Sequence, residues 1–212
     1  KGTVQNVYDL NQFMRSSSFG DVGALKVTTQ KFYRINGGST QLEGVKSDVV
    51  VPDRYSFIDI GEKDQDNPLP WDKIEAASYS LWDGFINYEE TIKNSKDRMA
   101  NNTQLRLIED QAKWVKKQSE EKEVSLSYSD YLERKEDIQE ISKKYEAIDD
   151  YKTNLTFSSL PYETELIKKD TVLAEKRKRW HENLAKDVYV EEAVNVLEDL
   201  QLSNIKRKNK VA

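Results

Sequence analysis

The sequence predicts an α+β protein in which a β-rich first part is followed by a mostly α-helical domain. The first observation is the distribution of glycine, since seven of the eight glycines lie within residues 1–66. The second is charge: residues 1–66 carry 17 charged side chains, whereas the 146 residues that follow carry 54. A glycine-rich, β-branched segment therefore gives way to a glycine-poor, charge-rich one, which indicates a boundary near "GEKDQDNPLP".

Two runs in the first part are typical of β-strands. Residues 2–10 ("GTVQNVYDL") are short and β-compatible, and residues 22–35 are rich in Val, Thr, Ile and aromatic side chains. The "NGGS" stretch that follows is expected to turn, because asparagine and glycine adopt positive φ angles at low cost. A third short strand is expected at residues 47–52, where Pro52 closes it.

The second part is expected to form helices, because its apolar residues recur at three- and four-residue steps. The clearest example is the apolar stripe of the second helix, formed by Leu105, Ile108, Ala112 and Val115. Pro161 suits the first turn of a helix, and we expect a single helix from there to about residue 185. The expected helices span residues 87–100, 103–120, 129–150, 161–185 and 188–202.

These signals divide the chain into three parts. Residues 1–66 form the β-rich part, residues 67–80 form a linker, and residues 81–212 form the helical domain. Trp71 follows two prolines in the linker. We expect its large side chain to anchor the linker to the β-rich part rather than to stack on a ligand.

Composition narrows the functions that the chain can have. Cysteine is absent and His181 is the single histidine, which excludes disulfides, thiolate metal sites and a cysteine nucleophile. The net charge of −5 gives no basis for binding nucleic acid, because a phosphate-binding surface needs concentrated basic residues. The sequence has no apolar run of about 18 residues, so it predicts no membrane-spanning helix. We expect neither a cofactor nor a metal.

The first five residues, "KGTVQ", place Lys1 and Gln5 four positions apart. If the chain turns at Gly2, the two side chains can approach each other. On these five residues alone, a lysine and a glutamine at the end of a strand are the better interpretation. The chain also starts without an initiator methionine, and we expect it to be part of a longer protein.

A longer stretch changes this interpretation. "KGTVQ" followed by "GALKVTTQKFYRINGGSTQLEGVKSDVVVP" resembles the carboxy-terminal processing proteases, also called tail-specific proteases. The linker "GEKDQDNPLPWDKIEAASY" is similar to that of the long Gram-negative branch of the family. One position departs from the family pattern, since Ser47 stands in a turn where proline is usual.

The resemblance implies a serine endopeptidase with a Ser-Lys dyad, in which residues 1–66 are the C-terminal part of the protease core. It assigns the role of general base to Lys1, and it assigns to Gln5 the role of orienting that lysine. The nucleophilic serine, the oxyanion hole and the peptide-binding domain would lie upstream of this chain. We therefore expect this fragment alone to be inactive.

The residue types suit that chemistry. A lysine amine has an ordinary pKa of about 10.4 and is normally charged, so it cannot accept a proton. Burial beside apolar walls disfavours the ammonium and lowers the pKa, which makes the amine a usable base for a serine hydroxyl. A neutral glutamine can orient the lysine, whereas a carboxylate at the same place would raise the lysine pKa.

The resemblance further implies the partners and the location of the full-length protein. Its substrates would be unfolded or C-terminally tagged proteins, and its other partners would be an adaptor lipoprotein and the upstream part of the same protein. Its location would be the periplasm, with association with the inner membrane as one option. The alternative function is a non-catalytic helical scaffold, residues 67–212, that docks an adaptor.

Overall fold

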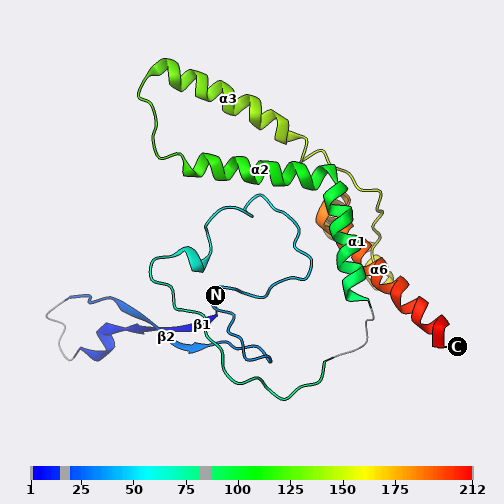
Figure 1. Cartoon of the computed structure of the whole chain (residues 1–212), viewed down its shortest axis with the longest axis horizontal. Coiled ribbons are helices and arrows are strands. Elements are labelled where there is room, and N and C mark those ends of the chain that lie inside the picture. Colours follow the sequence, from blue (N-terminus) through cyan, green and yellow to red (C-terminus); the bar gives the residue numbers. More distant parts are fainter. Residues whose placement is uncertain (1, 15–19, 82–86, 212) are drawn as a thin grey trace. The chain divides into compact units, whose positions relative to one another are not determined.

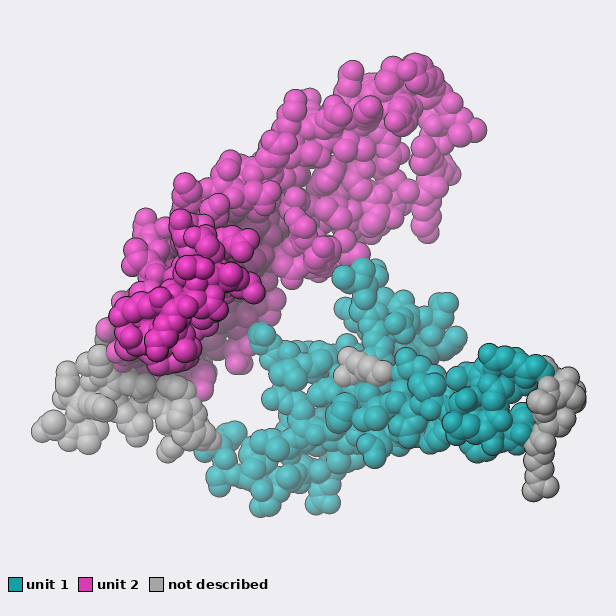
Figure 2. Space-filling model, turned by 180° about the vertical axis from the view of Figure 1, so that it is seen from behind, with its two compact units in different colours: residues 1–47, 59–82 teal, residues 48–58, 83–212 magenta. Residues whose placement is uncertain are grey.

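The computed structural model describes residues 2–14, 20–81 and 87–211. The chain divides into two compact units (Figure 2), here named the strand unit, residues 1–47 and 59–82, and the helical unit, residues 48–58 and 83–212. The described residues combine a two-stranded sheet with six α-helices. This confirms the α+β fold class with a mostly helical second part.

The strand unit contains an antiparallel pair of strands, β1 (Thr3–Asp9) and β2 (Ala24–Lys31) (Figure 1). Both strands lie within the two runs that the sequence predicted, which are rich in the β-branched residues that suit a pleated surface. A short 3-10 helix, η1 (Leu10–Phe13), follows β1. The register of the two strands shifts between Val4 and Gln5, which marks a β-bulge.

The third strand expected at residues 47–52 is wrong, because this segment joins no strand in the described part of the chain. Pro52 lacks the N–H group that a sheet ladder needs. Val51 packs instead against the apolar core of the helical unit, and Pro52 O accepts a hydrogen bond from Tyr189 Oη at 3.1 Å. Residues 48–58 therefore belong to the helical unit.

The helical unit holds the six helices of the described residues. They are α1 (Tyr88–Asn101), α2 (Thr103–Glu120), α3 (Tyr128–Glu146), α4 (Pro161–Ile167), α5 (Thr171–Leu184) and α6 (Val188–Val211). Asn102 separates α1 from α2, because its side chain caps α2 by accepting from the backbone N–H groups of Gln104 and Leu105. The first two helices lie where the sequence predicted them.

The single helix expected over residues 161–185 is wrong, because α4 and α5 both occupy this range. Pro161 stands at the start of α4, as expected. Asp170 then caps a new helix, since its Oδ1 accepts hydrogen bonds from the backbone N–H groups of Val172 and Leu173. The apolar periodicity runs through this point and does not reveal the break.

The apolar core of the helical unit forms around α2. Leu105 and Ile108 are buried there together with Val188 at the start of α6, and partly buried residues pack against them: Val51, Met99, Ile148 and Tyr151. Ala112 is fully buried as well. The stripe predicted along this helix is therefore confirmed.

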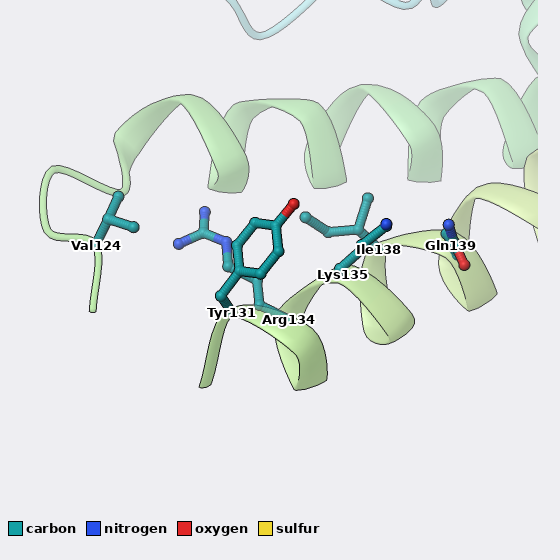
Figure 3. A pocket seen from close by; sticks show the side chains of 6 residues that line it. All are labelled: Val124, Tyr131, Arg134, Lys135, Ile138 and Gln139. Atoms are coloured by element: carbon teal, nitrogen blue, oxygen red, sulfur yellow. The ribbon is translucent and has the colours of Figure 1, made fainter. Parts of the chain in front are cut away.

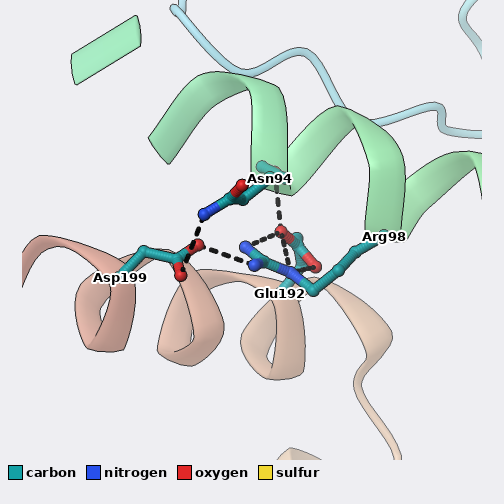
Figure 4. A network of polar contacts seen from close by, with 5 residues as sticks. Asn94, Arg98, Glu192 and Asp199 are labelled. Atoms are coloured by element: carbon teal, nitrogen blue, oxygen red, sulfur yellow. Dashed lines mark hydrogen bonds and ion pairs between the residues drawn. The ribbon is translucent and has the colours of Figure 1, made fainter. Parts of the chain in front are cut away.

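A polar network joins α1 to α6 (Figure 4). Arg98 forms ion pairs with Glu192 at 2.8 Å and with Asp199 at 2.6 Å. Ser95 Oγ donates a further hydrogen bond to Glu192 Oε1 at 2.6 Å. Because Glu192 is buried, its charge needs such partners. The hydrogen bonds to Glu192 are also the main reason that the pKa of Arg98 is raised.

Residues 70–77 form backbone hydrogen bonds with the turn that follows β2 within the strand unit. Ser39 N donates to Asp72 O at 3.0 Å, and Ile74 N donates to Gly37 O at 2.9 Å. Gly37 has a φ angle of 81°, and a Cβ added there would lie 2.1 Å from Ile74 O. This position therefore needs glycine, both for its backbone angle and for the close approach of the linker.

The substitution Gly37→Ala should loosen the contact between the linker and this turn. The clash and the strained φ angle together should cost about 2 kcal/mol or more. Hydrogen exchange in peptides that cover residues 70–77 should therefore become at least about tenfold faster.

Gly44→Ala is the matched control for this measurement. Gly44 also has a positive φ angle, of 63°, but a Cβ there would meet nothing within 4 Å. Its alanine variant should leave exchange in residues 70–77 unchanged. Equal acceleration by the two variants would contradict the role given to the close approach.

Candidate functional site

Lys1 and Gln5 are the two residues to which the sequence assigns catalytic roles. Lys1 lies outside the described residues. Gln5 lies on β1, where it is half-buried, and its Nε2 donates to Thr28 Oγ1 of β2 at 3.3 Å. The bulge leaves Thr29 as the extra residue of β2 beside this pair. Bulges of this kind re-aim the neighbouring side chains.

Gly2, which follows Lys1 in the chain, has both of its backbone polar groups bonded. Its N–H donates to Gln41 Oε1 at 2.9 Å, and its C=O accepts from Phe32 N at 2.7 Å. A Cβ at this position would lie 2.3 Å from Gln41 N, so a larger residue does not fit. The glycine of "KGTVQ" is therefore explained by the close approach of Gln41.

Gln41 is fully buried, with 0% of its surface exposed. Besides accepting from Gly2, its side chain donates through Nε2 to Glu62 Oε1 at 3.2 Å. A buried amide is costly unless its polar atoms are bonded, and these two bonds meet that need. Sequence reasoning missed this residue because periodicity does not distinguish it. Its place in "GGSTQ", inside the stretch that resembles the proteases, was the available signal.

Trp71 connects the linker to the same place. Its Nε1 donates to Ser39 O at 2.9 Å, so it anchors the linker within the strand unit as the sequence predicted. Ser39 is bonded to Gln41 as well, because Ser39 Oγ accepts from Gln41 N at 3.0 Å. A chain of hydrogen bonds therefore connects Trp71 of the linker to Gly2, first through Ser39 and then through Gln41.

A second clamp on the linker is formed by Asp72. Tyr33 Oη donates to Asp72 Oδ2 at 3.0 Å, and Lys31 Nζ lies 3.1 Å from Asp72 Oδ1. The hydrogen bond to Asp72, then burial and the charge of Asp72, raise the pKa of Tyr33, while Lys31 opposes this. The neutral phenol is favoured in the fold. The hydrogen bond from Tyr33 to Asp72 therefore stabilises the fold below the ordinary tyrosine pKa of about 10. This stabilisation is lost as the pH rises through the raised pKa of Tyr33.

The helical unit has an open apolar pocket between α3 and the loop that follows α2 (Figure 3). Its volume is about 430 Å³, and it is lined by Val124, Tyr131, Arg134, Lys135, Ile138 and Gln139. Val124 is 67% exposed and Tyr131 is 55% exposed, so solvent reaches the lining. The basic side chains of Arg134 and Lys135 contribute their aliphatic stems to it.

Metal clusters and membrane spans are both lacking in the described part of the chain. The acidic and histidine side chains there do not gather in groups of three that could hold a metal ion. None of the helices described above is long and apolar enough to cross a membrane.

The similarity of this chain to known proteins identifies its family. The model of the family "C-terminal domain of tail specific protease" matches residues 55–201. The chain belongs to this family. A tail-specific protease of Haemophilus influenzae is 40% identical over 133 residues, which cover 60% of this chain and 19% of that protein. The resemblance predicted from the sequence is thereby confirmed.

The chain spans about a fifth of the length of that tail-specific protease. The matched range of the family includes Glu62, Trp71 and Asp72, whereas Gln5 and Gln41 precede it. The bond from Gln41 to Glu62 therefore joins a residue outside the matched range to a residue inside it.

The substitution Asp72→Asn should lower the pKa of Tyr33 toward about 10, because it removes the charged acceptor that favours the neutral phenol. The measurement is an alkaline titration of phenolate absorbance. Because the chain has 11 tyrosines, the curve of Tyr33 is obtained as the difference between each protein and its Tyr33→Phe variant.

Asp66→Asn serves as the control in this titration, because Asp66 is an exposed carboxylate of the same unit. It should leave the difference curve where it is. A Tyr33 curve that stays in place in Asp72→Asn would show that another group raises this pKa.

Proposed function

We propose that this chain is the C-terminal portion of a serine endopeptidase that degrades or trims proteins from their C-terminal tails. The observation that carries the proposal is the match of residues 55–201 to the C-terminal domain of tail-specific proteases. The 40% identity to a protein with that name supports it. In this proposal the nucleophilic serine lies upstream, so the chain by itself is inactive.

Lys1 is the general base in this proposal, and Gln5 orients it. The hydrogen bond from Gln5 Nε2 to Thr28 Oγ1 supports the role of Gln5, because it fixes the direction of the amide. With Nε2 turned toward Thr28, Oε1 is on the opposite side of the amide and would accept a hydrogen bond from the lysine amine. The anchoring of Gly2 by Gln41 and Phe32 supports a fixed start for this strand.

The reaction would be acyl transfer in two steps. The neutral amine of Lys1 takes the proton of the upstream serine hydroxyl while the serine oxygen attacks the scissile carbonyl carbon. The resulting ammonium gives that proton to the leaving amine, and an acyl-enzyme remains. Water then attacks the ester with Lys1 again acting as the base, which releases the acid and frees the serine. Both steps require burial to lower the lysine pKa.

The same proposal gives the partners and the location of the full-length protease. Its substrates would be unfolded or C-terminally tagged proteins, which expose the tail that the enzyme cleaves. It would act in the periplasm. An adaptor lipoprotein and association with the inner membrane are further parts of the proposal.

The alternative function, a non-catalytic scaffold formed by residues 67–212, has narrower support. The pocket at Val124 and Tyr131 offers apolar surface on the helical unit, yet its lining specifies no partner. The contacts of Trp71 and Asp72 also tie part of that range to the strand unit rather than to the helices. We therefore place the scaffold second.

Lys1→Ala tests the proposed base in a full-length protease that contains this chain. Steady-state cleavage of a peptide with an apolar C-terminus should fall by about 10²- to 10⁴-fold, because a general base contributes a factor of this size. Lys26→Ala is the control, since Lys26 is exposed on β2, and it should keep full activity. Full residual activity of Lys1→Ala would sink the assignment.

Gln5→Glu tests the proposed orienting role in the same enzyme. A carboxylate beside the amine should raise the lysine pKa by about one unit or more. The acidic limb of the kcat profile should therefore move to higher pH, and activity should recover in alkaline solution. Gln12→Glu introduces the same charge at an exposed position after β1 and should not move the limb. An unmoved limb in Gln5→Glu would place Gln5 away from the amine.

A further inference from the structure

A buried amide beside the start of β1 has a role that the family match does not assign. We infer that Gln41 is a positioning residue that holds the backbone at Gly2 and thereby orients Lys1. The inference rests on the proposed function, because it matters for catalysis only where Lys1 is the general base. Its physical basis is the set of hydrogen bonds that Gln41 makes.

The bond to Gly2 acts on the peptide group that Gly2 shares with Lys1. This group is planar and includes the Gly2 N–H together with the Cα of Lys1. An acceptor that holds the N–H therefore fixes the orientation of the whole plane. Gln41 Oε1 lies 2.9 Å from Gly2 N, and the bond is buried from solvent. In this inference, Gln41 therefore acts on Lys1 through the peptide plane that it holds at Gly2.

Gln41 is itself held on its other side by a charged acceptor. Its Nε2 donates to the Glu62 carboxylate at 3.2 Å, and a charged acceptor makes a stronger bond than a neutral one. The bonds from Gly2 through the amide to the carboxylate run in one direction, so they polarise one another. A leucine of similar size would fill the same space without burying a polar group. Packing alone therefore does not explain the amide.

A second connection reaches Gln41 from the linker. Gln41 N donates to Ser39 Oγ at 3.0 Å, and Ser39 O accepts from Trp71 Nε1 at 2.9 Å. Both Glu62 and Trp71 lie within the range that matches the C-terminal domain family. That domain therefore contributes to the position of the proposed base, and Gln41 is the residue through which it does so.

The test uses a full-length protease that contains this chain, with peptide cleavage measured from about pH 6 to pH 10, around the ordinary lysine pKa. Gln41→Leu should lower kcat about tenfold or more and leave KM within about twofold, because a misoriented base affects the chemical step. The acidic limb of the kcat profile should move to higher pH, since a loosely held amine is better solvated. Gln65→Leu is the same substitution at an exposed position of the strand unit and should change neither.

A paired exchange separates positioning from a general loss of folding. Gln41→Glu places two carboxylates against each other, and it should lower kcat as Gln41→Leu does. Adding Glu62→Gln restores a pair of one carboxylate and one amide, with their positions exchanged. The carboxylate at position 41 can then accept the hydrogen bond from the Gly2 N–H. The double variant should therefore return kcat and the acidic limb toward their original values. This pair of variants carries the test if Gln41→Leu does not fold.

The outcomes distinguish the two proposals. If Lys1→Ala lowers cleavage by about 10²-fold or more while folded Gln41→Leu keeps the original kcat and pH profile, the positioning role is overturned and the proposed function stands. If Lys1→Ala keeps full activity, the proposed function itself fails. In a third outcome, kcat falls, the acidic limb stays in place, and the paired exchange does not restore kcat. Gln41 then has a purely structural role, which also overturns the inference.

Discussion

The hydrogen bond from the Gly2 N–H to the buried Gln41 amide is the interaction on which the proposed site depends. It requires glycine at position 2, because the Gln41 backbone leaves no room for a Cβ. It also requires a polar partner for the rest of the amide, and Glu62 supplies one. Because burying an unpaired amide is costly, these residues depend on one another. The start of β1 is therefore determined by residues far from it in the sequence.

The elements of the fold that could be predicted are those with a strong local signal. The stripe of Leu105, Ile108 and Ala112 gave α2, since a repeat of three and four residues leaves few alternatives. The break at Asp170 was missed because one capping side chain decides it. The strand predicted at residues 47–52 does not form, because Pro52 cannot donate to a sheet ladder and Val51 packs against the helical core instead.

The residues of the candidate site likewise divide into those that the sequence could predict and those that it could not. Lys1 and Gln5 were named because the stretch that contains them resembles a known family, and no physical pattern in five residues could have named them. Gln41 lies in that stretch too, but its importance comes from bonds to Gly2 and Glu62, which are 39 and 21 residues away in the sequence. Contacts of this kind leave no periodic signal. The model of the C-terminal domain family begins at residue 55 and so does not include Gln41.

The network that joins α1 to α6 has a consequence for how the helical unit is made. Arg98 contacts partners 94 and 101 residues later in the chain. Closing so long a loop costs entropy before the ion pairs can return any energy. During synthesis α1 leaves the ribosome first, and its polar face has no partner until α6 has emerged. This unit therefore cannot complete its folding from its N-terminal end, because α6 must be synthesised before Arg98 of α1 can form its ion pairs.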